Sequence, residues 1–426
     1  MRFQIDQYQL ENGLRVNLSL DHSQPVVAVN LWYNVGSRNE RIGRTGFAHL
    51  FEHMMFQGSQ NVPDTQHIAH VERVGGSMNG STWLDRTNYF ETVPANRLEL
   101  ALWLESDRMG FLLPAMTQQK LDNQRDVVKN ERRWRVDNQP YGDWDERLQS
   151  LVYPPDHPYH HSVIGSMEDL DAATLEDVQT FFRTYYAPNN AVLTICGDFD
   201  PVRAREMVEA YFGSIPRGPE TPPIPGTAAI PTRLEGPVRD TVDAAVALPR
   251  IYAAFRIPSY GEKEFYVADV VAHLLASGKA SRLYGGFVRR QLAQSVSAYA
   301  LPVVTGASML IVWITGNPQT PVAVLEERLW EEVERLRTES CSTGELERVL
   351  TSITARETIS LQRVGERADQ ISMFTTLFDD PERINEELEA YRGITPEDVR
   401  EFVNEHVARD RSAFLTYLPR PAQEAA

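Results

Sequence analysis

Apolar residues recur three and four positions apart between Thr45 and Gly58, the spacing that places them on one face of a helix. The apolar residues of this segment are Phe47, Leu50, Phe51, Met54 and Met55. We expect Thr45 to cap the helix and Gly58 to end it. A second helix is predicted from Thr117 to Asn138, with Thr117 as its cap. Its expected apolar positions are Leu121, Val127, Val128 and Trp134.

Two helix–strand pairs occur twice along the chain. The segment 174–182 matches 395–403 at an offset of 221 residues, and both begin with a Thr and an acidic residue in the arrangement of a capping box. Strand-like segments follow at 191–196 and 412–417. At an offset of 224, the apolar strand 25–32 matches 249–256, and each of these strands precedes a helix. The chain therefore reads as a duplication.

Proline and glycine are concentrated between Gly213 and Pro237, which is typical of an extended linker. We predict a first domain over 1–215, a linker over 216–236 and a second domain over 237–426. The fold class expected from this pattern is α+β. Each domain is expected to pack helices on a mostly antiparallel sheet.

Composition and charge narrow the function further. The chain has 426 residues, 42% of them apolar, but no apolar run of the roughly 18 residues that a membrane span needs. Its net charge of −17 argues against a nucleic-acid partner. The first residues show no apolar stretch of a signal peptide, which predicts a cytoplasmic protein, or a periplasmic one if the numbering starts at a mature form. The two cysteines make no disulfide framework.

The most informative motif is H-x-x-E-H at residues 49–53. On a helix, His49 and His53 lie four residues apart on one face, with Glu52 beside them. Two imidazoles at this spacing can bind one Zn²⁺, and a neighbouring carboxylate can take a proton from water. In the second half His49 corresponds to His273, but Glu52 and His53 correspond to Ala276 and Ser277. Only the first half keeps the motif.

Zinc needs a further protein ligand, and Glu131 on the predicted helix 117–138 is the best candidate. It follows His53 by 78 positions. Gln124 lies two turns earlier on nearly the same face and could hydrogen-bond a ligand. Spacing alone leaves open that Glu131 is a surface carboxylate. A histidine group at positions 157, 160 and 161 lies in a proline-rich segment, and we expect it to be structural.

These motifs resemble the pitrilysin-type zinc peptidases, which include the mitochondrial processing peptidases and bacterial two-domain forms. The resemblance covers most of the chain. It rests on the segments 49–53, 125–131, 75–82, 85–89, 103–108, 157–159 and 281–284.

The resemblance implies that His49, His53 and Glu131 bind Zn²⁺ and that Glu52 is the general base. It also implies that a substrate peptide pairs with the strand that carries Asn79, Gly80, Ser81 and Thr82. The implied activity is that of a zinc metalloendopeptidase that hydrolyses peptides or unfolded segments.

Two positions depart from the family pattern. Gln124 stands where the family often has an acid. The second half has Phe287 and Gln294 where complete members carry an Arg and a Tyr that hold substrate. Arg289, Arg290 and Tyr299 are nearby but lack the matching spacing.

We therefore expect the chain to be the zinc-bearing subunit of a heterodimer whose related partner supplies the Arg/Tyr pair. A homodimer remains open. The alternatives are a non-catalytic, peptidase-like scaffold subunit and a zinc-dependent peptide-binding module. The intact set of ligands and Glu52 argue against both.

Overall fold

A computed structural model describes residues 2–420, and within them the chain forms two compact units. The first unit contains the chain up to Arg132, Ser162–Pro225 and Arg356–Glu387. The second contains Arg133–His161, Gly226–Ala355 and the chain from Leu388 onward. The units interleave along the sequence, because each predicted half contributes one segment to the unit built mainly from the other half. The predicted boundaries at 215 and 237 describe the sequence repeat, and the break between Pro225 and Gly226 falls inside the predicted linker.

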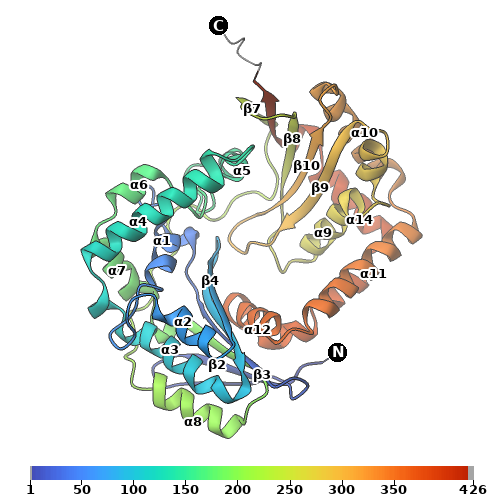
Figure 1. Ribbon diagram of the computed structural model, residues 1–426. Coiled ribbons are helices and arrows are strands. Elements are labelled where there is room, and N and C mark those ends of the chain that lie inside the picture. Colours follow the sequence, from blue (N-terminus) through green and yellow to red (C-terminus); the bar gives the residue numbers. More distant parts are fainter. Residues whose placement is uncertain (1, 421–426) are drawn as a thin grey trace. The chain divides into compact units, whose positions relative to one another are not determined.

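The first unit is built on a six-stranded sheet with the order β1-β2-β6-β3-β5-β4 (Figure 1). Its strands are β1 Asp6–Gln9, β2 Arg15–Leu20, β3 Val26–Tyr33, β4 Ser77–Thr82, β5 Thr87–Pro94 and β6 Ala191–Gly197. Only β2 and β6 pair in parallel. All other neighbours in this sheet are antiparallel. The strand β4 is the last in the order and pairs with β5 alone among the described residues.

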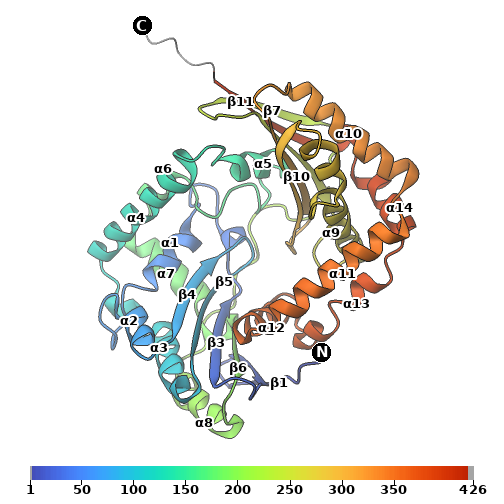
Figure 2. The ribbon, with the colours of Figure 1, turned by 45° about the vertical axis from the view of Figure 1, so that its right-hand side comes forward.

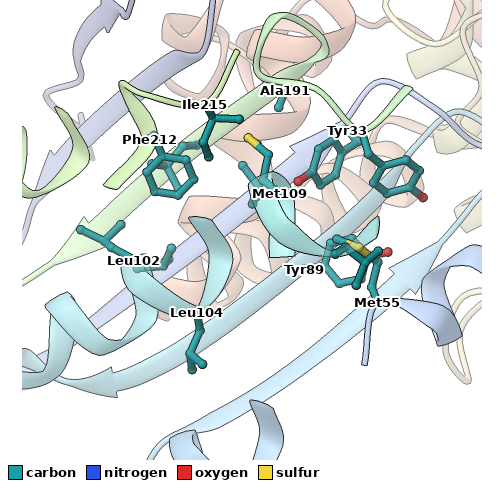
Figure 3. Packing of buried hydrophobic residues seen from close by; sticks show 14 of the residues in the cluster. Tyr33, Met55, Tyr89, Leu102, Leu104, Met109, Ala191, Phe212 and Ile215 are labelled. Carbon is teal, nitrogen blue, oxygen red and sulfur yellow. The ribbon is translucent and has the colours of Figure 1, made fainter. Parts of the chain in front are cut away.

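The side chains of strand β3 are buried on both faces of this sheet. Val27, Val29 and Leu31 are fully buried in the main apolar core, part of which is seen in Figure 3. This core is packed by the helices α1 Phe47–Met54, α2 Gln66–Arg73, α3 Leu98–Phe111, α4 Gln118–Arg132, α6 Met167–Ala172, α7 Leu175–Tyr185 and α8 Pro201–Phe212. The alternate residues Asn30 and Trp32 point to the other face, as the period of a strand requires.

That other face is covered by a single helix from the second half of the sequence, α12 Val364–Phe378, which packs on β3 and β6 (Figure 2). The contact is largely polar. The Oδ1 atom of Asp369 accepts hydrogen bonds from Trp32 Nε1 at 2.8 Å, Asn88 Nδ2 at 2.9 Å and Asn30 Nδ2 at 3.2 Å. Further along the helix, Ser372 Oγ donates to the Thr194 hydroxyl at 2.7 Å. These bonds satisfy polar groups that the sheet would otherwise bury without partners.

The second unit has a five-stranded sheet with the order β7-β11-β8-β10-β9. Its strands are β7 Val238–Ala244, β8 Arg250–Ile257, β9 Ala293–Leu301, β10 Ser308–Gly316 and β11 Ala413–Pro419. Its helices include α5 Trp144–Val152, α9 Lys263–Ala276, α10 Val322–Glu339, α13 Glu389–Arg392 and α14 Pro396–His406. The helix α11, Thr343–Ser360, begins in this unit and ends in the first. Both sheets are mostly antiparallel and carry helices, so the predicted α+β class is confirmed.

The repeated elements of the sequence have the same local structure in both units. Thr174 and Thr395 each form the predicted capping box, with Asp177 and Asp398 as the reciprocal acids. The helices they begin, α7 and α14, are followed by the strands β6 and β11. Because the same capping box begins both helices, the same sequence pattern predicts a helix start at Thr174 and at Thr395.

The hydrogen bonds to Asp369 should stabilise the first unit. Replacing Asp369 with Ala removes an acceptor from three buried donors, of which Asn88 Nδ2 keeps a bond to Asn30 Oδ1 at 3.3 Å. The free energy of unfolding should therefore fall by about 2 kcal/mol. Asp379→Asn is the control, because this carboxylate at the end of the same helix is exposed and Asn tolerates its positive φ of 56°. Its pair with Arg15 should contribute about 0.5 kcal/mol or less. Urea unfolding followed by circular dichroism measures both changes, and equal losses would contradict the assignment.

Candidate metal centre

The helix α1 begins differently from the prediction. Its N-cap is Gly46, with a φ of 82°, and it makes no side-chain cap. Thr45, the predicted cap, instead donates its hydroxyl to Asp169 Oδ2 at 2.6 Å. The first amides of the helix are bound by Glu40, whose carboxylate accepts from Gly46 N at 2.9 Å and from Ala48 N at 2.7 Å.

Glu40 is a residue that the sequence reasoning missed. It stands six positions before Gly46, outside the three-residue spacing of a capping box, so no local pattern marks it. Burial raises the pKa of Glu40 to about 8, although its bonds to backbone amides favour the charged form. The helix that carries the zinc motif is thus anchored by a buried acid.

His49, His53 and Glu131 come together between α1 and α4, two helices that pack on each other. The distance from Glu131 Oε2 is 3.3 Å to His53 Nε2 and 3.7 Å to His49 Nε2. The three ligand atoms all lie within 4.8 Å of one another, and the side chains are partly buried. Among the described residues, this is the only group of three or more histidines, cysteines and acids with such spacing.

The geometry fits a zinc ion. Zinc bonds nitrogen and oxygen at about 2.0–2.2 Å in a tetrahedron, which separates ligand atoms by roughly 3.3–3.6 Å. The measured separations of Glu131 from the two histidines are close to this range, and the chemistry of two imidazoles and a carboxylate is that of catalytic zinc sites. Three protein ligands also leave a fourth position for water.

Glu52 lies beside the predicted ligands and is held by strand β4. The Thr82 hydroxyl donates to Glu52 Oε2 at 2.6 Å. Burial raises the pKa of Glu52, whereas the bond from Thr82 and the nearby His53 work in the opposite direction. The sequence pointed to Thr82 only as a substrate-binding residue, so its contact with Glu52 is new information from the structure.

Glu131 lies near the C-terminal end of α4. The cap and the buried residues of this helix agree only in part with the prediction. The Thr117 hydroxyl accepts from Lys120 N at 3.3 Å, and Leu121 and Val128 are buried. Val127 and Trp134, which were expected on apolar faces, are instead 45% and 66% exposed. The α-helix also ends at Arg132, and a π-helical turn, Arg133–Asp137, follows. This turn changes the register, so Trp134 does not continue the buried stripe.

Gln124 is buried on α4, two turns before Glu131. Its predicted role beside the ligands stays a prediction. Asn79, Gly80, Ser81 and Thr82 all lie on β4, the outer strand of the sheet. An outer strand has one row of backbone groups available for pairing. The position of β4 is therefore compatible with the predicted pairing of a peptide along this strand, which stays a prediction.

In the second unit the residues that replace the motif are structural. His273 lies on α9 and its Nδ1 is 2.9 Å from the carbonyl oxygen of Asp269, and Ser277 is the C-cap of this helix. Phe287 is fully buried in the apolar core, and Gln294 is exposed on β9. An Arg could not replace Phe287 without placing its charge in this core.

The histidine group near Pro158 is structural, as expected. His157 is buried, stacks on Tyr153 with ring centroids 4.7 Å apart and accepts a hydrogen bond from Tyr159 N. Burial lowers the pKa of His157 to about 4. A neutral, packed imidazole of this kind needs no metal.

Comparison with known proteins agrees with the fold. Residues 15–153 match the family described as Insulinase (Peptidase family M16), and residues 172–353 match the Peptidase M16 inactive domain. The chain is 31% identical to the zinc protease PqqE of Helicobacter pylori over 372 residues, which cover 85% of this chain and 78% of that protein. The chain belongs to the M16 peptidase family, which is the pitrilysin family.

Two further comparisons support this assignment. The crystal structure of a protease from Helicobacter pylori superposes with a TM-score of 0.91 at 27% identity, covering 98% of this chain and 100% of that one. A probable mitochondrial-processing peptidase subunit beta of Arabidopsis thaliana is 25% identical over 68% of this chain and 53% of that protein. The predicted family is confirmed. No helix among residues 2–420 combines the length and apolar character needed to cross a membrane.

The buried acid at the start of α1 should give stability a characteristic pH dependence. Because the pKa of Glu40 is raised to about 8 in the folded chain, folding favours its protonated form. Its contribution is fully present below the pKa of the unfolded chain, about 4.3, and is lost as the pH rises through about 8. Glu40→Gln should therefore flatten the fall in unfolding free energy between pH 5 and 8 by about 1 kcal/mol or more.

The measurement is urea unfolding at several pH values. Glu220→Gln, at an exposed carboxylate that pairs with Arg217, is the control and should leave the pH profile unchanged. A Glu40→Gln variant with the wild-type profile would contradict the raised pKa.

Proposed function

We propose that this chain is a zinc-dependent endopeptidase that cleaves peptides or unfolded segments. The observation that carries the proposal is the convergence of His49, His53 and Glu131 with Glu52 beside them. A Zn²⁺ ion at this site would supply a Lewis acid and lower the pKa of water to about 7. The names of the relatives, which are zinc proteases, support the same activity.

The remaining chemistry belongs to the residues of the chain. Glu52 accepts a proton from the attacking water and later delivers it to the leaving amine. The raised pKa of Glu52 suits this role, since a proton acceptor works best with a pKa near the working pH. Thr82 fixes the orientation of the carboxylate through its hydrogen bond at 2.6 Å.

Strand β4 connects this chemistry to substrate binding. Thr82, the last residue of β4, contacts Glu52, and the strand has a free edge. A peptide that pairs with this edge is held through its main chain, which gives affinity with little dependence on sequence. Such a strand runs past Glu52 and brings a peptide bond to the zinc ligands.

The second unit supports a heterodimer in the proposed function. Phe287 and Gln294 occupy the positions at which complete members of the family carry Arg and Tyr. Phe287 is fully buried in the apolar core, so its side chain cannot take the place of the missing Arg. The substrate-holding pair then comes from a related subunit. A homodimer would not supply it, because each copy has the same residues. The location of the protein, cytoplasmic or periplasmic, stays a prediction from the sequence.

A non-catalytic scaffold is the second candidate, and the description of residues 172–353 as an inactive domain is compatible with it. That description applies to the half without the motif. The first half keeps Glu52 and its bond to Thr82, neither of which a scaffold or a peptide-binding module requires. The geometry thus favours the enzyme.

Substitutions at Glu131 and Glu52 should separate metal binding from catalysis. The purified chain should contain about one zinc, and Glu131→Gln should weaken zinc affinity at least about tenfold, because a charged ligand is lost. Glu52→Gln should keep the zinc and reduce peptide hydrolysis by a factor of about 10² to 10⁴.

Elemental analysis measures the zinc content, and a fluorogenic peptide mixture measures hydrolysis. Glu72→Gln, at an exposed position of helix α2, is the control and should change neither quantity. Near wild-type hydrolysis by Glu52→Gln would refute the mechanism. The absence of zinc after metal is supplied would favour the scaffold.

The missing Arg/Tyr pair predicts weak activity of the isolated chain. Addition of a related M16 subunit that carries both residues should raise peptide hydrolysis by a factor of about 10² or more, since donors to a developing oxyanion have effects of this size. The same subunit with its Tyr changed to Phe is the control. Equal rates for the isolated chain and the mixture would show that no such partner is needed.

A further inference from the structure

A pocket of about 640 Å³ lies on the face of the first sheet that carries α12, apart from the predicted zinc ligands. Its lining includes residues of β3, β4 and β5 and of the first turn of α12, all of them in the first compact unit. Because α12 packs chiefly on β3 and β6, it leaves β5 and β4 less covered on this face. The pocket therefore borders strand β4, which contributes Ser77 and Ser81 to it.

Three large apolar side chains of this lining are only partly buried. Phe90 lies on β5, Val26 is the first residue of β3, and Val364 is the first residue of α12. The neighbours of Phe90 along β5, Tyr89 and Glu91, point to the opposite face of the sheet and are buried there. Phe90 thus presents its ring on the α12 side, where the chain does not bury it fully.

The charged groups of the lining already have partners within the chain. Asp369 Oδ1 accepts three hydrogen bonds, and Arg86 Nη1 donates to Asn88 Oδ1 at 3.0 Å. Arg363 pairs with Glu366 at 3.2 Å. The two arginines and two acids leave the pocket without a formal net charge. A ligand is therefore offered mainly the apolar side chains.

The register of the sheet relates Phe90 to the free edge of β4. Phe90 pairs with Asn79, and Ser77 and Ser81 lie two residues to either side of Asn79 on the same strand. Residues that pair across neighbouring strands point to the same face. On this face β4 carries only these three short side chains, which leave the Phe90 ring accessible from the side of the free edge.

A peptide strand paired to that edge continues the alternation of side chains. Every second side chain of the peptide lies on the face of Phe90, and the others lie on the face where Thr82 binds Glu52. Neighbouring strands are about 5 Å apart, so the peptide backbone is roughly 10 Å from that of β5. A Leu, Met or Phe side chain can cross the short residues of β4 and bury apolar surface against Phe90, whereas a charged one would lose water without gaining a partner.

We propose that this pocket is a side-chain subsite that selects apolar residues, such as Leu, Met or Phe, at alternate positions of a peptide bound along β4. This inference rests on the proposed function for the location of the peptide. It adds a specificity to a binding mode that otherwise reads only the main chain, and it assigns Phe90 as the residue that determines it.

The test measures binding, so that it does not depend on turnover. Zinc-loaded Glu52→Gln protein is titrated with fluorescent peptides in which each position of one unstructured host carries Leu, Asn, Asp or Lys in turn. Asn is the closest match to Leu in shape and lacks its apolar surface. Leu should bind about fivefold more tightly than Asn, Asp or Lys at positions two residues apart. Fluorescence anisotropy gives the affinities.

Two pairs of variants in the same background test the location. Phe90→Gln removes the aromatic surface, and Phe111→Gln, at a 41% exposed phenylalanine that ends α3, is its control. Gly365→Leu fills the pocket, since a Cβ there would meet only Thr92 Oγ1 at 3.5 Å, and Gly344→Leu, in open space on α11, is its control.

The preference for Leu should disappear in Phe90→Gln and in Gly365→Leu and persist in both controls. The loss should be confined to the alternate positions, so that a preference on the zinc side of the peptide stays unchanged. Peptides with Asn at these positions should bind Phe90→Gln as tightly as the parent protein, which shows that the variant keeps its fold.

The outcomes separate this inference from the proposed function. No alternate preference, no binding of any peptide, or a preference that survives in Phe90→Gln would overturn the subsite. Cleavage by the wild-type protein without the preference would leave the peptidase intact and refute the subsite. The preference without any cleavage, also in the presence of a partner subunit, would keep the subsite and refute the peptidase.

Discussion

The packing of α4 against α1 is the constraint on which the rest of the site depends. Two predicted ligands and Glu52 come from α1, but Glu131 comes from α4 and follows His53 by 78 positions. Leu121 and Val128 are fully buried on α4, and burial of such a side chain in the core stabilises the fold by about 1.5–3 kcal/mol. The packing of α4 on α1 brings Glu131 Oε2 within 3.7 Å of the Nε2 atoms of both histidines.

The two faces of the first sheet differ in chemistry. One face is apolar and carries α1, so the zinc motif rests on a rigid base. The other face presents Asn30, Trp32 and Asn88, and α12 satisfies them through Asp369.

Corresponding positions in the two halves of the chain carry different residues. The first unit keeps the motif, and the second has filled the equivalent positions with packed residues. His273 is bound within its own helix, and Phe287 is part of the apolar core. These choices stabilise the second unit and remove its chemistry.

The sequence by itself determined the features that depend on local spacing. The i, i+4 histidines, the two capping boxes at Thr174 and Thr395 and the apolar strand at 25–32 were readable, because each involves residues a few positions apart. The α+β class followed from the repeated helix–strand pairs. Glu131 could be suggested from its helix and supported by family resemblance, but spacing left it open.

Only the tertiary structure decided the features that join distant parts of the chain. Glu40 replaced Thr45 at the start of α1, because Asp169 takes the Thr45 hydroxyl. The position of α12 on the first sheet, the edge position of β4 and the bond from Thr82 to Glu52 likewise involve partners from separate segments. The reason is physical: burial and charge at each of these residues are set by neighbours that sequence distance does not specify.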